Sequence, residues 1–405
     1  MFRRIVRYSD KRFGIFNLIE DITDLRQRPQ ISAGDVSFSI FSMIFSNLGS
    51  LNKFNLSRDI SAISALCGRV PSSSTIARSA DSIDLESLRE IQNVIYLKAR
   101  RAKMMQPCNG RWIGIIDGHE ITSSDIYKCE CCSIRNVSKV EGVEKLNYYH
   151  RYTAFILAGQ KFCFMLDIEP IYPHEGELTS AYRLLKRVCL NYPRAFELVV
   201  GDGLYLNGPT FSLLASHNKY AAAVLKDDTR ALYEEAVSLS KITEPLVYED
   251  GKTVYRVWEH NIKGLWSGYE DSVRVIRSEE VKEVRTHSQV LGKWELKQER
   301  TDWFWVTNLP SVVGLKSVVS MCHSRWQIEN NCFNEIVSTW NGDHVYRHSS
   351  NAISAFMLFL FIALNIFNIF FARNIKDRRI RSKVLLIDLI KAEFLLARWI
   401  HPIPI

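Results

Sequence analysis

Residues 112–118 read WIGIIDG and residues 196–205 read FELVVGDGLY, and these two stretches decide the fold. Each is a short apolar run that ends in Asp-Gly, as expected for a buried strand followed by a turn. In open α/β sheets, sites form at the carboxyl ends of the strands. If the two strands are neighbours, Asp117 and Asp202 project into one crevice. The alternative is that each Asp-Gly pair only makes a turn.

The sequence around these stretches predicts an α/β core. Apolar runs at 152–157 and 161–166, three residues apart, predict a hairpin, and the run at 220–225 predicts a further strand. Helices are expected at 177–192 and 209–217. The order is therefore β-β-β-α-β-α-β, which is typical of a mixed sheet extended by crossover connections and flanked by helices.

The segments on either side of this core have different patterns. Residues 1–105 are predicted to be helical, with one helix that begins at the cap residue Asp84. The break near Gly68 and the serines after it resemble a helix–turn–helix corner, although ordinary helical hairpins look the same. Residues 228–300 alternate polar and apolar side chains, which predicts an antiparallel β insertion.

The positive charge of the chain is concentrated at its ends. The 405 residues have a formal charge of +8. Residues 1–110 hold 16 basic and 10 acidic residues, residues 371–405 hold 8 and 3, and the middle holds 28 and 31. This suggests an enzymatic core between two polyanion-binding ends, or else merely solvated helix faces. Nine cysteines and no secretory signal predict a reducing compartment.

A third carboxylate is expected on a long helix at about 314–340. On a regular helix, Glu329 falls within the apolar stripe, whereas Glu335 falls on the opposite side. A buried glutamate is costly unless something compensates its charge. Arg325, four residues earlier, is a candidate partner, so the site is either a structural ion pair or a metal-binding carboxylate held by Arg325.

Three carboxylates on two strands and one helix suit hard divalent cations. Mg²⁺ and Mn²⁺ prefer oxygen ligands, and two such ions activate a nucleophile and stabilise a leaving oxygen in phosphodiester chemistry. A negatively charged site would need metal before it could accept nucleic acid, for which the basic ends would supply phosphate contacts.

The motifs resemble those of the DDE transposases of bacterial insertion sequences, in the branch with a Tyr-Arg-Glu-Lys signature. IIDGHEITSS at 115–124 resembles the first-aspartate motif, VVGDGLY at 199–205 the second, and HSRWQIENNCFNE at 323–335 the glutamate helix. The resemblance covers about residues 35–375. It implies a ribonuclease-H-like core and assigns catalytic roles to Asp117, Asp202, Glu329 and Arg325, the three carboxylates also being metal ligands.

The resemblance also implies a function and a set of domains. The expected activity is two-metal cleavage and joining of DNA at the element's terminal inverted repeats and at target DNA, by a homodimer assembled on DNA. The expected location is the cytoplasm, at the nucleoid. The domains predicted are a helical DNA-binding domain, the first part of the core, the β insertion, the end of the core and a basic tail, at 1–105, 106–227, 228–300, 301–372 and 373–405. Five tryptophans are candidates for stacking on an extruded base, although core packing is the preferred interpretation for any one of them: Trp258, Trp266, Trp294, Trp303 and Trp305.

Two positions depart from the signature. Cys322 stands where the family has Tyr, and Ile336 stands where it has Lys. In the family those residues help to hold DNA ends; here Lys226 or Arg347 could take their place. The alternative function is therefore an inactive or domesticated transposase-derived DNA-binding protein, or a nuclease that does not transpose.

Cysteines 129 and 132 form a Cys-x-x-Cys pair with His119 and His150 on either side. A zinc site of two cysteines and two histidines is one interpretation. A single pair without a second one is weak support, so free thiols in a reduced loop are the preferred interpretation.

The most hydrophobic stretch, at 355–371, approaches the length of a membrane span. Asn365 and Asn368 interrupt it, and only ten consecutive residues are apolar. We therefore predict a buried helix and no membrane association, with a membrane anchor as the alternative.

Overall fold

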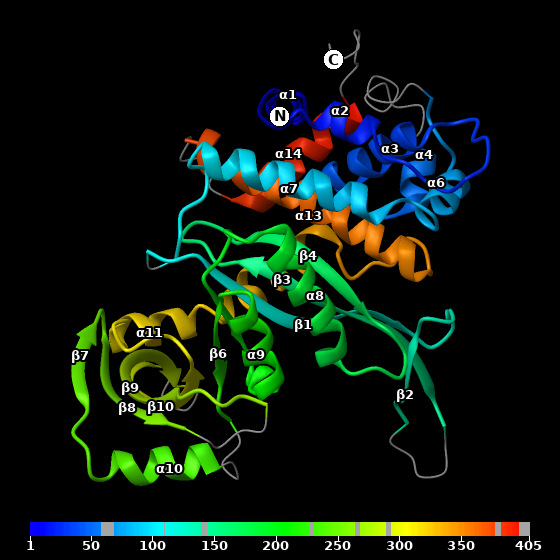
Figure 1. Cartoon of the computed structure of the whole chain (residues 1–405). Helices are drawn as coiled ribbons and strands as arrows, with labels where there is room; N and C mark the ends of the chain where they lie inside the picture. The colour runs from blue at the N-terminus through cyan, green and yellow to red at the C-terminus, as the bar shows by residue number, and fades with distance from the viewer. Residues whose placement is uncertain are drawn as a thin grey trace. The chain divides into compact units, whose positions relative to one another are not determined.

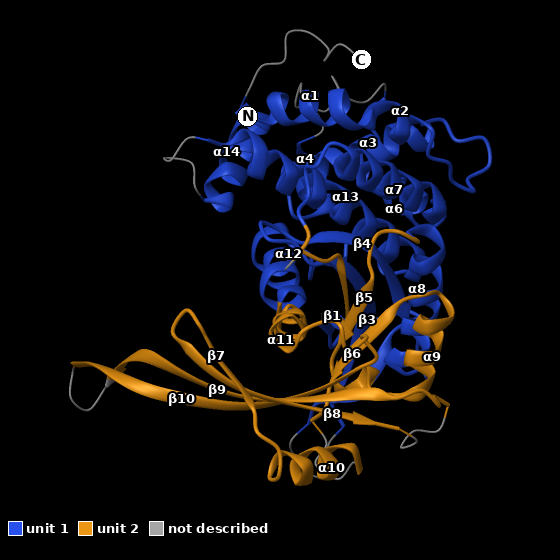
Figure 2. Ribbon diagram, turned by 60° about the vertical axis from the view of Figure 1, so that its left-hand side comes forward, with its two compact units in different colours: residues 1–106, 118–192, 327–405 blue, residues 107–117, 193–326 orange. Residues whose placement is uncertain are grey.

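The computed structural model describes residues 1–57, 69–108, 110–138, 144–226, 231–263, 268–288, 293–376 and 382–396. The chain folds into two compact units, coloured separately in Figure 2. Unit 1 comprises residues 1–106, 118–192 and 327–405, and unit 2 comprises residues 107–117 and 193–326. The chain therefore passes between the units several times, and strand β1 (Ile113–Ser124) contributes residues to both.

The N-terminal part of unit 1 is helical, as the sequence predicts. The helix predicted to begin at Asp84 is α7, and the Asp84 carboxylate accepts hydrogen bonds from the backbone N–H groups of Glu86 and Ser87. Of the predicted corner, Gly68 lies outside the described residues, while Ser72 caps the next helix through the N–H of Thr75. The helices are α1 (Phe2–Phe13), α2 (Ile15–Glu20), α3 (Ala33–Phe45), α4 (Leu51–Leu56), α6 (Ser73–Ala80) and α7 (Leu85–Arg101).

The most hydrophobic segment forms the central helix of unit 1, α13 (Ser350–Asn374), which packs against α3, α7 and β4 (Figure 1). By length and composition it is the one helix among the described residues that could cross a membrane, but 89% of its most apolar window is buried in the protein. Buried Asn365 accepts from the N–H of Met165 (3.0 Å) and donates to its carbonyl (2.8 Å). The asparagine therefore anchors α13 to β4, because its amide is fully paired there with backbone groups.

The sheet of unit 1 is built on a hairpin. Strand β3 (Leu146–Leu157) pairs antiparallel with β4 (Phe164–Ile171) and with β2 (Ser133–Asn136), and it also neighbours β1 in the sheet. The predicted hairpin is confirmed, but its strands are longer than the apolar runs because their polar ends also pair. Helix α8 (Glu177–Asn191) packs on β3 and β4.

An ion-pair network joins α7, β4 and α8. Asp167 on β4 is 1% exposed and bonds Arg89 (3.0 Å) and Arg187 (2.6 Å). Glu169, two residues further on the same strand, bonds Arg187 (2.7 Å) and Arg183 (2.6 Å). Each buried carboxylate is thus met by two guanidinium groups, which offsets much of its desolvation cost.

The sheet of unit 2 begins with parallel strands. Strand β1 pairs with β5 (Leu198–Gly201), and β5 pairs with β6 (Tyr220–Val224), all parallel. Helix α9 (Gly208–Ser216) connects β5 to β6, as the sequence predicts. The strand that leads to Asp117 and the strand that ends before Asp202 are therefore neighbours, which is the condition on which the predicted shared crevice of the two aspartates depends.

Four antiparallel strands extend this sheet. Their order from β6 is β10, β9, β8 and β7. Strand β10 carries the sheet outward because its last residues, from Trp305 on, pair with β6 on one side, while its whole length pairs with β9 on the other. The apolar residues at 304–306 lie at the end of this single long strand. The elements are α10 (Ala231–Ser240), β7 (Leu246–Asp250), β8 (Thr253–Ile262), β9 (Val273–Ser288) and β10 (Lys293–Thr307).

The helix predicted at 314–340 is broken into three parts. Helix α11 (Leu315–His323) belongs to unit 2, while the π-helical turn η2 (Ile328–Phe333) and helix α12 (Asn334–Trp340) belong to unit 1. A π turn takes more residues per turn than an α-helix, so it rotates the side chains that follow. The prediction of one continuous helix was therefore wrong. The last helix described is α14 (Lys383–Leu396), within the predicted basic tail; residues 377–381 and 397–405 of that tail lie outside the described residues.

Candidate active site

Asp117 lies within β1 and Asp202 directly follows β5, at matching positions along these two neighbouring parallel strands. The register pairs Ile115 with Val200, and each aspartate follows two residues later. Side chains two residues apart on a strand share a face, so the two carboxylates extend the same row. One expectation was wrong: Asp117 does not end its strand, because β1 continues to Ser124, beyond the residues up to Ile115 that pair with β5.

The VVGDGLY stretch makes a tight turn that fixes Asp202. The Asp202 Oδ1 atom accepts from the N–H of Leu204 (2.8 Å), and its carbonyl accepts from the N–H of Tyr205 (3.1 Å). The ring of buried Tyr205 folds over Gly201, where an added Cβ would lie 2.7 Å from a ring carbon. Gly201 is therefore required by this close approach, and Asp202 both caps the turn and presents a carboxylate at the end of β5.

Arg325 lies beside the first aspartate. Its guanidinium is 3.6 Å from the carboxylate of Asp117, and both residues belong to unit 2. The side chain of Arg325 is 10% exposed and that of Asp117 is 17% exposed. At this distance the pair is a charge interaction rather than a short hydrogen bond, so the arginine lowers the local negative charge without saturating the carboxylate.

Glu329 is exposed, so the prediction that it lies on a buried stripe was wrong. It occupies the π turn η2, where Ile328, Cys332 and Phe333 are the buried residues. The steady 100° per residue of an α-helix does not apply there, so a position calculated from Val318 falls on the wrong face. Glu329 belongs to unit 1, whereas Asp117 and Asp202 belong to unit 2.

The two positions that depart from the signature are filled by core residues. Cys322 is 1% exposed on α11, and burial raises the pKa of its thiol to about 12. Ile336 is fully buried on α12, against Gly342. Neither side chain offers a polar group to a ligand, so both act in packing.

The two basic residues considered as replacements differ in their surroundings. Lys226 is exposed just beyond β6, and its side chain would lie 3.9 Å from a Cβ at Gly203, the residue after Asp202. Arg347 instead bonds Asp81 (2.7 Å) on the helical side of unit 1. Of these two residues, Lys226 is therefore the one that lies near a site aspartate.

The candidate tryptophans fall into different environments. Trp258 and Trp305 are buried packing residues, Trp294 is 58% exposed, and Trp266 lies outside the described residues. Trp303 lines a cavity of about 460 Å³ in unit 2, together with Tyr248, Tyr255, His323 and Trp326. Of the candidates whose surroundings are described, Trp303 is the one that faces a cavity with other aromatic rings.

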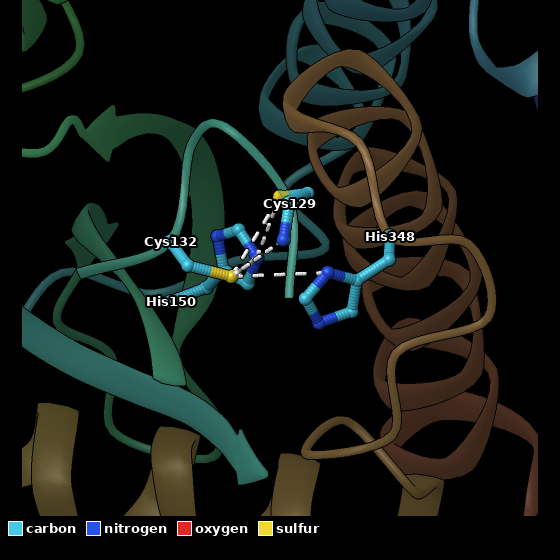
Figure 3. A group of neighbouring side chains, drawn as sticks. All are labelled: Cys129, Cys132, His150 and His348. Carbon is cyan, nitrogen blue, oxygen red and sulfur yellow. Dashed lines mark hydrogen bonds between the residues drawn. The ribbon is translucent and has the colours of Figure 1, made fainter. Parts of the chain in front are cut away.

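A second cluster of candidate ligands lies in unit 1. Cys129, Cys132, His150 and His348 converge so that one ligand atom from each lies within 4.8 Å of the others (Figure 3). His119 is not among them; its ring stacks on Phe333 with centroids 4.3 Å apart. His348 was missed in the sequence because it lies almost two hundred residues after His150 and belongs to no Cys/His spacing pattern.

Burial favours the neutral forms of Cys129, His150 and His348. Burial, with the nearby thiol of Cys132, raises the pKa of Cys129 to about 11. Burial and the neighbouring His348 lower the pKa of His150 to about 4, and burial lowers the pKa of His348. These imidazoles are therefore neutral at pH 7, which is the form that binds metals.

The fold defines the class of protein. A mixed sheet with acidic residues on neighbouring parallel strands, flanking helices and a helical N-terminal region is consistent with a ribonuclease-H-like transposase fold. Comparison with protein families matches residues 109–366 to the transposase DDE domain, which is more than half of the chain. The chain therefore belongs to the DDE transposase family. Comparison with curated proteins finds no match.

Proposed function

We propose that this protein cuts and joins phosphodiester bonds at the ends of an insertion element, with Asp117, Asp202 and Glu329 as the catalytic carboxylates. The observation that carries the proposal is the alignment of Asp117 and Asp202 on neighbouring parallel strands within a transposase DDE domain. The assignment of Glu329 rests on its spacing from Arg325 in the sequence.

The donor atoms of this set suit a pair of Mg²⁺ or Mn²⁺ ions. All three side chains offer carboxylate oxygens, the ligands that hard divalent cations prefer. When bound, two such ions activate the attacking hydroxyl or water and stabilise the leaving 3′ oxygen of a phosphodiester. Asp117 and Asp202 would hold the ions through the row of side chains that they share.

Positive residues would position the DNA around these carboxylates. Arg325 would limit the repulsion between Asp117 and a phosphate, because its guanidinium lies 3.6 Å from that carboxylate. Exposed Lys226, beside Gly203, would contact the backbone of the DNA near Asp202. Trp303 would offer its ring to an unpaired base in the cavity of unit 2.

The proposed reaction requires a larger assembly. Two element ends must be joined, so we propose a homodimer on DNA at the nucleoid, in the cytoplasm. The basic ends of the chain, 1–110 and 371–405, would bind the terminal inverted repeats.

The direct experiment is cleavage of a labelled duplex that carries the DNA flanking the gene. We expect strand cleavage at the element end with Mg²⁺ or Mn²⁺, none with a chelator, and joining of the released 3′ end to other DNA. A duplex of scrambled sequence is the control. Equal cleavage of both duplexes would indicate a nuclease without transposase activity.

The second candidate function is a DNA-binding protein of transposase origin that does not cut. Buried Cys322 and Ile336 favour it, because residues that hold DNA ends in the family are replaced here by core side chains. Specific binding of the terminal repeat without cleavage in either metal would support this alternative. We also expect Ile336→Lys, which introduces the residue of the family signature, to destabilise this protein, because the lysine charge would be buried in the core.

A further inference from the structure

We propose that Cys129, Cys132, His150 and His348 bind one structural zinc ion, separate from the carboxylate site. The proposal rests on the geometry of unit 1 and does not depend on the proposed catalytic function. The four residues come from three segments: the β1–β2 connection supplies both cysteines, β3 supplies His150, and the connection before α13 supplies His348 (Figure 3).

Four of the six distances between the ligand atoms are close to those of a tetrahedral zinc site, and the other two are at most 4.8 Å. A tetrahedral ion with Zn–S of about 2.3 Å and Zn–N of about 2.0–2.1 Å separates two sulfurs by about 3.8 Å, and a sulfur from a nitrogen by about 3.6 Å. The two sulfurs here are 3.7 Å apart, and His150 Nε2 is 3.4 Å and 3.3 Å from them. His348 Nδ1 lies 3.8 Å from the Cys132 sulfur.

The chemistry of the donors selects the ion. Thiolate and imidazole ligands favour zinc over Mg²⁺ or Ca²⁺, which take oxygen ligands. Two thiolates and two neutral imidazoles balance the charge of Zn²⁺, so the filled site is neutral. Cys132 and His150 are buried, and a neutral complex avoids the cost of burying a net charge there.

The cysteine loop is shaped to present both sulfurs. The N–H of Cys132 donates to the carbonyl of Cys129 (3.2 Å), which closes the turn. The N–H of Cys129 donates to the sulfur of Cys132 (3.2 Å). A backbone donor aimed at a sulfur stabilises its thiolate form, as hydrogen bonds around metal ligands commonly do.

The ion would fasten the segment that follows Glu329. The connection at 341–349 links α12, which continues the π turn bearing Glu329, to the central helix α13. Asp81 already holds this connection, through Arg347 (2.7 Å) and the hydroxyl of Ser349 (2.6 Å). Zinc bound to His348 would tie the same connection to β3 and to the cysteine loop. Four protein ligands leave no open position, which is the mark of a structural rather than a catalytic zinc site.

Metal content of the purified full-length protein tests the proposal. After growth with added zinc, we expect about one zinc per chain, and loss of most of it in Cys129→Ser and in His348→Ala. Cys131→Ser is the matched control, because Cys131 lies between the two ligands but outside the cluster, and it should keep its zinc. Less than about a tenth of an equivalent in the wild-type protein would overturn the proposal.

A second measurement uses the wild-type protein alone, so it does not depend on whether the variants fold. Wild-type protein loaded with Co²⁺ should show the strong visible absorption of a tetrahedral thiolate site, and zinc should abolish it. A weak octahedral spectrum, or a disulfide between Cys129 and Cys132 in place of metal, would contradict the proposal. A chelator should lower the thermal midpoint by several degrees, with recovery on zinc but not on Mg²⁺. None of these readouts uses DNA, so their failure is distinct from a failure of transposase activity.

Discussion

The two candidate metal sites of this protein are built in opposite ways. In unit 2, Asp117 and Asp202 share a row on parallel strands, and both remain partly exposed. In unit 1, the Cys/His cluster gathers four ligands from three segments, two of them buried. A metal held by these carboxylates would keep positions for water and substrate, whereas four protein ligands would close around one ion. The carboxylate site is therefore suited to catalysis, and the Cys/His cluster is suited to stabilising the fold.

The way in which each site is positioned also differs. Strand register places Asp117 and Asp202 at matching positions, so the loss of one side chain should leave the sheet intact. The cluster instead depends on a connection fixed by Asp81, Arg347 and His348. Substitutions should therefore affect activity in the first case and stability in the second.

The largest expected effect is on cleavage. Asp202→Asn should keep the turn, because asparagine also caps the N–H of Leu204, yet it removes a carboxylate ligand. We expect the cleavage rate to fall about 10³-fold, with the thermal midpoint nearly unchanged. Asp84→Asn, at the cap of α7, is the matched control and should cleave normally. Normal cleavage by Asp202→Asn would contradict the expectation that substitutions at the carboxylates affect activity whereas those at the cluster affect stability.

A stability effect of similar size is expected in unit 1. Arg187→Ala removes a guanidinium from Asp167, which is 1% exposed, and from Glu169. We expect a loss of about 3–5 kcal/mol in the free energy of unfolding, because a buried carboxylate loses a partner. Arg135→Ala breaks an exposed pair with Glu120 and should cost at most about 1 kcal/mol. Denaturant titration compares the two; equal losses would show that the network is not a stabilising feature.

The smallest expected effect concerns the connection that carries His348. Although burial alone would raise it, hydrogen bonds from Arg347 and Ser349 hold the pKa of Asp81 below its usual value. Its stabilisation is therefore complete above the unfolded pKa of about 3.9 and is lost as the pH falls through the lower folded pKa. The pair is partly exposed, so the effect is at most about 1 kcal/mol. Thermal midpoints of wild type and Asp81→Asn should converge below about pH 4; a constant difference would contradict this.

The sequence predicts the parallel strands and the central helix well, because they depend on apolar runs. Asp202 and α13 lie where those runs place them. The sequence does not predict that Asn365 pairs with the backbone of Met165, because that contact joins segments two hundred residues apart. His348 was missed for the same reason, because it lies far along the sequence from Cys129 and Cys132.

Glu329 shows a different limit. The calculation that placed it on a buried stripe assumed a regular helix, and nothing in the letters IENNCF marks a π turn. The catalytic assignment of Glu329 came from its spacing after Arg325, and the error in its burial leaves that spacing unchanged. The assignment therefore stays a prediction.

The most direct test of the account compares two glutamates of the same segment. Glu329→Gln and Glu335→Gln remove one charge each, six residues apart; Glu335 bonds Lys383 (2.6 Å) and has no proposed catalytic role. With Mg²⁺ and end-containing DNA, we expect Glu329→Gln to lose cleavage about 10³-fold and Glu335→Gln to cleave at close to the wild-type rate. Wild-type cleavage by a folded Glu329→Gln protein would contradict the proposed catalytic triad.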